Sequence, residues 1–155
     1  MEVALQNKLH FIGVDFVNIN VTVENHVPKD NPPTIDFKIT PKVFYPDGTT
    51  DEFVIINDVK LTCKDFFNIS IIAFGFFRMP GITGDIKDQK PFININAPAI
   101  MFPYIRSFIS TLTGNLGVNF QPIIIPPHFF HGELEEHIET PKIQTGESTQ
   151  IGSGK

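Results

Sequence analysis

Four side chains in the C-terminal part of the sequence have the chemistry of metal ligands. His128, His131, Glu135 and His137 lie close together in the chain, and imidazole and carboxylate groups are ligands that zinc takes in proteins. His131 and Glu135 would share one face of a helix that began early enough to contain both. No clear fourth ligand accompanies them, and histidine and glutamate are common on solvated surface helices. We therefore predict a solvated acidic helix here and no metal site.

The single cysteine could act as a nucleophile only with a base beside it. Cys63 would need a histidine such as His10 or His26 to take its proton, and nothing in the sequence places either one near it. A lone cysteine within a strand pattern is typical of a small buried apolar side chain. One cysteine cannot form an internal disulfide, which is compatible with a reducing compartment.

Motifs for other reactions are missing from the sequence. There is no glycine-rich phosphate loop, no G-x-S-x-G turn and no H-E-x-x-H helix. The acidic residues of the first half alternate with apolar ones, which indicates a solvated face and not a paired acid and base. We therefore predict a binding protein and no enzyme, with no cofactor.

The composition combines apolar excess with acidity. Hydrophobic residues make up 41% of the 155 residues, charged residues 19%, and 16 residues are Phe. Some of this aromatic surface is predicted to lie between subunits or against a ligand, although a Phe-rich core explains the composition equally well. A net charge of −5 argues against nucleic-acid binding. The acidic N-terminus lacks the pattern of a signal peptide and no apolar run is long enough to span a membrane, so we expect a cytoplasmic protein without membrane insertion.

The first half of the chain has the period-2 pattern of strands. Val17, Ile19, Val21 and Val23 alternate with polar residues, and further strands are predicted over residues 35–40, 53–64 and 66–79. Short connections between them favour an antiparallel sheet. Pro41 favours an edge or a bulge in the second strand.

The fourth predicted strand is apolar on both faces. One face would carry residues at positions 67, 69, 71 and 77, and the other would carry Ile72, Phe74 and Phe76. Such a strand must be covered on both sides, by its own domain, by a neighbouring subunit or by a ligand.

The pattern then changes to that of a helix. Met101, Ile105, Phe108, Ile109 and Leu112 fall on one helical face, with Asn96 as a plausible N-cap and Gly114 after the last turn. Pro103 predicts a bend, or a helix that properly begins near it. An apolar loop with three prolines follows up to residue 130, then a short helix over residues 133–138, with Leu134 and Ile138 on one face. We expect one domain over residues 1–139 and a disordered polar tail over residues 140–155.

Several stretches resemble the SecB family of export chaperones. The resemblance covers roughly residues 10–138, and it is most specific in Phe102-Pro103-Tyr104-x-Arg106. It is carried by residues 96–106 (NAPAIMFPYIR), 117–118 (GV), 122–130 (PIIIPPHFF) and 75–82 (GFFRMPGI).

The resemblance implies an α+β fold, a four-stranded antiparallel sheet followed by a long helix, an apolar Pro-rich loop and a short C-terminal helix. It also implies a homotetramer, built as a dimer of dimers, that binds unfolded preproteins in apolar grooves without ATP. By position, the groove-lining residues would be Phe74, Phe76, Val118, Phe120, Ile124 and Phe130. Ile69, Ile71 and Ala73 would face a subunit interface or the core, and Phe108 and Leu112 would join the interface.

One departure from the family pattern concerns the motor ATPase SecA. Export-dedicated members present acidic residues on the outer sheet face to bind SecA, whereas the matching positions here hold Asn18, Thr22, Asn68 and Ser70. SecA binding is therefore in doubt. A SecB-like chaperone of a toxin–antitoxin system, which protects an antitoxin, is the alternative within the family. Outside it, the alternatives are a binder of a small hydrophobic ligand and a purely structural assembly subunit.

Overall fold

Four long strands and one long helix form the framework of the described residues. The computed structural model describes residues 9–80, 86–127 and 132–138. In chain order, the elements are β1 (His10–Val23), β2 (Asp36–Phe44), β3 (Glu52–Cys63), β4 (Phe67–Arg78), a 3₁₀ turn η1 (Ile86–Asp88), a π-helical turn η2 (Phe92–Asn96), α1 (Ala97–Gly114) and β5 (Glu135–Glu136). Strands followed by a long helix confirm the predicted α+β class.

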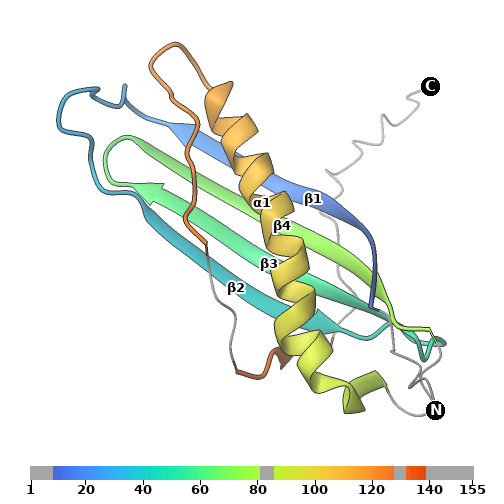
Figure 1. The fold of residues 1–155 in the computed structure, drawn as a ribbon. Helices are drawn as coiled ribbons and strands as arrows, with labels where there is room; N and C mark the ends of the chain where they lie inside the picture. Colours follow the sequence, from blue (N-terminus) through green and yellow to red (C-terminus); the bar gives the residue numbers. More distant parts are fainter. Residues whose placement is uncertain (1–8, 81–85, 128–131, 139–155) are drawn as a thin grey trace, which may run out of the picture.

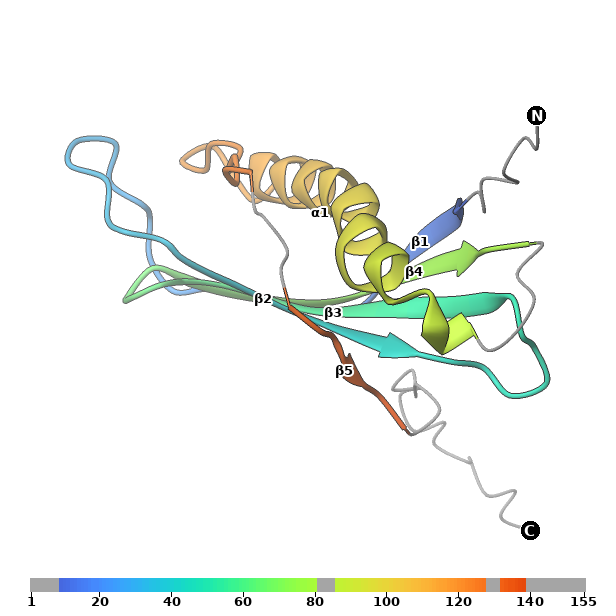
Figure 2. The ribbon, with the colours of Figure 1, turned by 60° about the horizontal axis from the view of Figure 1, so that its bottom comes forward.

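The sheet has the order β1-β4-β3-β2-β5 (Figure 1). The four long strands are antiparallel, as predicted, while β5 pairs parallel to β2 through two residues. α1 lies across one face of the sheet, which we call the helix face (Figure 2). In the part of the chain that the structure describes, no helix covers the opposite face, which we call the open face. None of the described helices is long and apolar enough to cross a membrane.

The core lies between the helix face and α1. Strand alternation places one set of β3 and β4 side chains on this face, all with exposed fractions of at most 2%: Phe53, Ile55, Val59, Leu61, Ile69, Ile71, Ala73 and Phe77. The helical period brings Met101, Ile105 and Ile109 onto them, each at most 1% exposed. The two-faced pattern predicted for β4 is confirmed, because Ile72, Phe74 and Phe76 lie opposite open-face residues of β3.

β1 departs from simple alternation. Its register with β4 shifts between Phe11 and Gly13 and again between Val17 and Asn20, where Asn18 has φ of 49°. Each shift exchanges the faces of the residues that follow. Val17 therefore faces Ile72 on the open face, while Val21 faces Ile69 in the core, and the prediction that both share one face is wrong.

α1 begins without the predicted cap. Asn96 has helical dihedral angles and makes no side-chain capping bond, because the chain enters α1 directly from the π-helical turn η2. Pro103 lies inside the helix on its exposed side.

The predicted C-terminal helix over residues 133–138 does not form. β5 and its flanks are extended there, preceded by Gly132 with φ of +83°. The segment is too short to form a stable helix on its own, and it gains backbone hydrogen bonds at the sheet edge instead.

Candidate functional site

An apolar groove lies at one end of the sheet, between the connection from β1 to β2 and the chain that follows α1. We call the first segment the crossover loop (residues 24–35) and the second the post-helix loop (residues 115–127). Both segments lie at the same end of the molecule (Figure 1). The groove has a volume of about 350 Å³ and is lined by Val27, Pro28, Lys29, Pro32, Ile35, Phe67, Asn119, Phe120, Gln121, Pro122, Ile123 and Ile124.

The post-helix loop is fixed at its two ends by the core. Thr113, in the last turn of α1, is fully buried; its hydroxyl donates to the Ile109 carbonyl at 2.7 Å and accepts the Ile123 N–H at 2.8 Å. Ile125 is only 3% exposed and anchors the far end of the loop. Between these anchors, Phe120 packs on Phe67 with ring centroids 5.6 Å apart. The loop is therefore held over the end of β4 with its apolar residues accessible.

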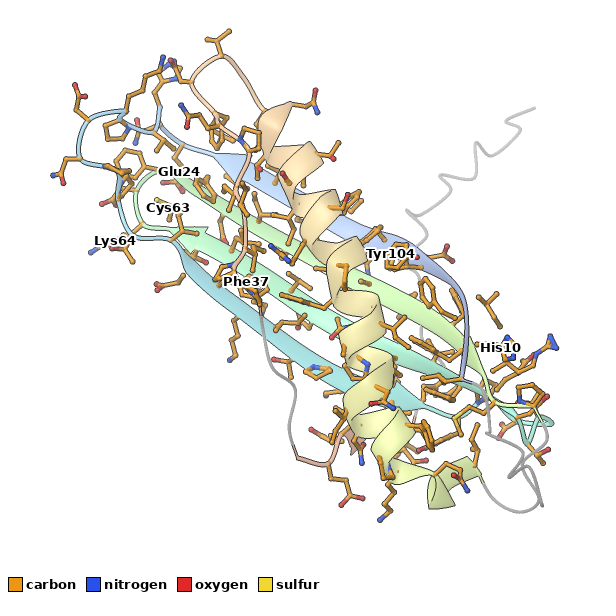
Figure 3. The ribbon with its side chains drawn as sticks, in the orientation of Figure 1. His10, Glu24, Phe37, Cys63, Lys64 and Tyr104 are labelled. Carbon is orange, nitrogen blue, oxygen red and sulfur yellow. The ribbon has the colours of Figure 1, made fainter. Side chains whose placement is uncertain are left out.

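The crossover loop is fixed by hydrogen bonds to the turn between β3 and β4. The Glu24 N–H donates to the Phe66 carbonyl at 2.7 Å, and the Asn25 side chain donates to the Asp65 carbonyl at 2.8 Å. His26 Nδ1 lies 3.1 Å from the side-chain nitrogen of Asn119, which joins the two walls of the groove. Glu24, Cys63 and Lys64 mark this end of the sheet in Figure 3.

The predicted groove residues do not lie together. Phe120 and Ile124 line the groove, and Ile124 keeps an exposed fraction of 76%. Val118 is 95% exposed at the loop tip and is not among the lining residues. Phe130 lies outside the described residues.

Phe74 and Phe76 lie on the open face, away from the groove. They line a separate hollow of about 390 Å³ together with Ile12, Phe44 and Val54. Because the sheet separates the two faces, one extended ligand cannot contact this hollow and the post-helix loop as a single groove.

The residues predicted for an interface also divide. Ile69, Ile71 and Ala73 lie in the core beneath α1 at 0%, 2% and 0% exposure, which is the second of the two places expected for them. Phe108 and Leu112 are partly buried against the core. Phe108 stacks on Phe16 of β1, with ring centroids 4.0 Å apart.

The crossover-loop wall was not predicted from the sequence. The sequence pattern predicts a Pro-rich break at Val27 and Pro28 and places Ile35 in the second strand, without a binding role for any of the three. The signal present in the sequence is an apolar residue, Ile35, close to two prolines. The fold adds that 37% of Ile35 is exposed and shows which segment this residue faces.

Among the described residues, Cys63 is not placed for catalysis. Cys63 is 1% exposed in β3, and burial, together with the nearby charge of Asp36, raises the pKa of its thiol above 9.0. A neutral, buried thiol is a poor nucleophile. No cluster of three or more His, Cys, Asp or Glu side chains forms among the described residues; His128 and His131 lie outside them. Glu135 lies near Lys42, with 4.0 Å between the charged atoms.

Comparison with known proteins places this fold. The family model described as "Preprotein translocase subunit SecB" matches residues 13–139. The chain belongs to the SecB family. It is 35% identical over 111 residues to the uncharacterized protein MJ0357 of Methanocaldococcus jannaschii, covering 66% of this chain and 68% of that protein.

Relatives named as SecB match over shorter stretches. The protein-export protein SecB of Orientia tsutsugamushi (strain Boryong) is 33% identical over 76 residues, covering 48% of this chain and 45% of that protein. The SecB of Nitrosomonas europaea is 29% identical over 99 residues, covering 61% and 59%. The chain thus spans about half the length of these SecB proteins.

A solved structure shares the SecB fold. It is the Mycobacterium tuberculosis Rv1957 SecB-like chaperone in complex with a ChAD peptide from the Rv1956 HigA1 antitoxin, with a TM-score of 0.67 and 17% identity over 77% of this chain and 90% of that chain. This likeness concerns the fold, while membership of the SecB family supports a chaperone role.

The open face of this SecB family member carries charges of both signs. Thr22, Asn68 and Ser70 lie on it, as uncharged residues at one end. Strand register places four carboxylates and four basic side chains on the same face: Asp15, Asp36, Glu52, Asp58, Lys38, Lys42, Lys60 and Arg78. The face is therefore mixed in charge and not acidic.

Proposed function

We propose that the protein is an ATP-independent holdase that binds extended apolar segments of unfolded polypeptides in the groove between the crossover and post-helix loops. The observation that carries this proposal is the accessibility of that groove. Ile35 and Ile124 stay 37% and 76% exposed although they line a hollow of about 350 Å³. Exposed apolar surface of this kind is typical of an interaction site.

The chemistry of the groove supports a polypeptide ligand without sequence specificity. Its walls are mainly aliphatic and proline side chains, and Lys29 is the charged residue among the lining residues. Apolar contact is not directional, so such walls favour many apolar sequences over one. The prolines limit the conformations of both loops, which lowers the entropy lost when a client binds.

Within this function, protection of an antitoxin fits the molecule better than delivery to SecA. The open face is mixed in charge, whereas the family resemblance associates SecA binding with an acidic face. We further propose the family's homotetramer as the active form. The alternative is that the protein binds unfolded preproteins and delivers them to a partner other than SecA.

The test is suppression of aggregation. The purified protein, at several-fold excess and without ATP, should keep a chemically denatured model protein soluble as measured by light scattering. Ile124→Ser should weaken suppression several-fold, because it removes exposed apolar surface from the groove. Ile95→Ser is the matched control, since Ile95 is 47% exposed but lies in η2, outside the groove.

Three results would count against the holdase. Aggregation that proceeds unchanged at several-fold excess would exclude it directly. Native mass spectrometry that finds a bound lipid, together with no affinity for unfolded peptides, would favour a binder of small hydrophobic ligands. The molar mass of the oligomer can be measured by static light scattering. If Ile124→Ser dissociated the oligomer without changing client capture, the protein would be a purely structural subunit.

A further inference from the structure

A short segment of the chain is bound to the edge of the sheet as an extended peptide. We call residues 132–138 the edge strap. Its β5 pairs with Lys42 and Val43 of β2, and the His137 N–H donates to the Val43 carbonyl at 2.8 Å. At its other end, the Leu134 N–H donates to the side-chain oxygen of Asn94 at 3.0 Å. Figure 2 shows β5 beside β2, at the edge of the sheet.

The side chains of the edge strap make two further kinds of contact. Leu134 packs against the core beside a hollow of about 370 Å³ that Val43, Tyr45 and Ile93 also line. Its three carboxylates each face a lysine. The distances between the charged atoms are 3.0 Å for Lys90–Glu133, 3.1 Å for Lys87–Glu136 and 4.0 Å for Lys42–Glu135.

These contacts form a complete set for the recognition of an extended peptide. Main-chain hydrogen bonds at a sheet edge supply affinity, and a slot for one side chain together with flanking charges supplies specificity. The set is also weakly held, because the strand pairing covers two residues and exposed ion pairs contribute little. A segment held by so few contacts opens more readily than the core.

We propose that this edge is a second polypeptide-binding site, which the edge strap occupies in cis and from which a segment of another polypeptide can displace it. The fitting partner is an extended segment with one apolar residue flanked by carboxylates, because the site gathers Lys42, Lys87 and Lys90 around an apolar slot. The site shares no residue with the loop groove. The inference therefore goes beyond the proposed holdase function and does not depend on it.

Displacement can be measured with the sequence of the edge strap itself. The probe is a fluorescent peptide of residues 132–138 (GELEEHI), followed by anisotropy. The double variant Glu133→Lys/Glu136→Lys releases the strap, because its new lysines repel Lys90 and Lys87. The peptide should bind this variant roughly tenfold more tightly than wild type, if the strap closes the site for about nine-tenths of the time.

A control peptide with the same apolar residues and reversed charges distinguishes charge recognition from non-specific apolar binding. The control peptide GKLKKHI keeps the leucine and reverses the three charges, and it should bind the released variant about tenfold more weakly, since each of three exposed pairs contributes a factor of about two. In Lys87→Glu/Lys90→Glu, the preference between the two peptides should reverse. Equal binding of both peptides, or equal binding of GELEEHI to wild type and released variant, would overturn the proposal.

Two measurements keep the test interpretable. Circular dichroism and thermal unfolding establish that the released variant is folded. Leu134→Ser provides a second way to release the strap without changing any charge, and it should give the same tighter binding of GELEEHI. If aggregation suppression fails while this peptide still binds, only the loop-groove proposal is refuted. If suppression holds while no peptide binds any released variant, only the edge site is refuted.

Discussion

Gly75 of β4 lies against Met101 of α1 without room for a side chain, and we predict that Gly75→Ala destabilises the protein by about 2 kcal/mol. An added Cβ would lie 2.6 Å from Met101 Sδ and 3.0 Å from a Phe77 ring carbon. Met101 is fully buried, and its sulfur accepts the Asn57 side-chain N–H at 3.0 Å. A methionine side chain can usually change its conformation to make room. Here such a movement would also break the buried hydrogen bond from Asn57 to the Met101 sulfur.

The magnitude follows from two opposing effects. Overpacking a core by one methyl group costs about 1–3 kcal/mol, and loss of the Asn57 contact adds to it. Replacing glycine in a strand returns roughly 0.5–1 kcal/mol through the unfolded state. The net loss of about 2 kcal/mol corresponds to a decrease in Tm of about 4–8 °C for a domain of this size.

Urea unfolding and thermal scans at one fixed protein concentration provide the assay, since assembly would make Tm depend on concentration. Gly13→Ala is the matched control, because nothing lies within 4 Å of a Cβ built there. Adding Met101→Ala removes the sulfur that lies 2.6 Å from the new Cβ, so the two substitutions should couple by about 1 kcal/mol or more. If Gly75→Ala is as stable as Gly13→Ala, or if Met101→Ala leaves its effect unchanged, the proposed contact is not the cause.

Two further predictions concern the groove anchor and the cysteine. Thr113→Val leaves the Ile123 N–H without its acceptor and should lower the free energy of unfolding by about 1–3 kcal/mol. Hydrogen exchange at the Ile123 amide should become faster and client capture weaker. Unchanged exchange at this amide would contradict the role of Thr113 as an anchor. The raised pKa of Cys63 means that the neutral thiol is favoured in the folded state, so its contribution to stability is complete below pH 9.0 and is lost as the pH rises through the higher folded pKa. The urea midpoint should fall above pH 9.0 in wild type but less in Cys63→Ala, and a thiol reagent should react only on unfolding; rapid reaction in the native state would show that the thiol is accessible.

Local patterns predicted the long elements because those elements bury one regular face. The alternation in β3 and β4 and the helical spacing of Met101, Ile105 and Ile109 are imposed by the same core, so pattern and structure agree. The sequence pattern does not predict the beginning of β1, where one register shift lies between Phe11 and Gly13; the second shift lies inside the alternating stretch that does predict a strand. Alternation cannot reveal where a bulge exchanges the faces.

The candidate site was less predictable because its parts are distant in sequence. Ile35 and Ile124 line the same groove because the sheet and the end of α1 bring their two loops together. The family resemblance predicts Phe74 and Phe76 in the same groove by their position, but sequence alone does not say which face of their strand α1 covers. The edge strap has the composition of a helix, but it is too short to form a stable one and takes its backbone hydrogen bonds from β2 and Asn94, which lie far from it in sequence.

The irregular edge of β1 has a consequence for the protein's own solubility. No strand in the described part of the chain pairs with the outer edge of this 14-residue strand, and a long free edge is a template for fibril growth. The two register shifts and the left-handed Asn18 divide that edge into short lengths. A regular strand from a misfolded chain cannot pair along all of it. The edge of β1 is therefore a poor template for fibril growth, although side chains such as Val118 and Ile124 are exposed elsewhere on the molecule.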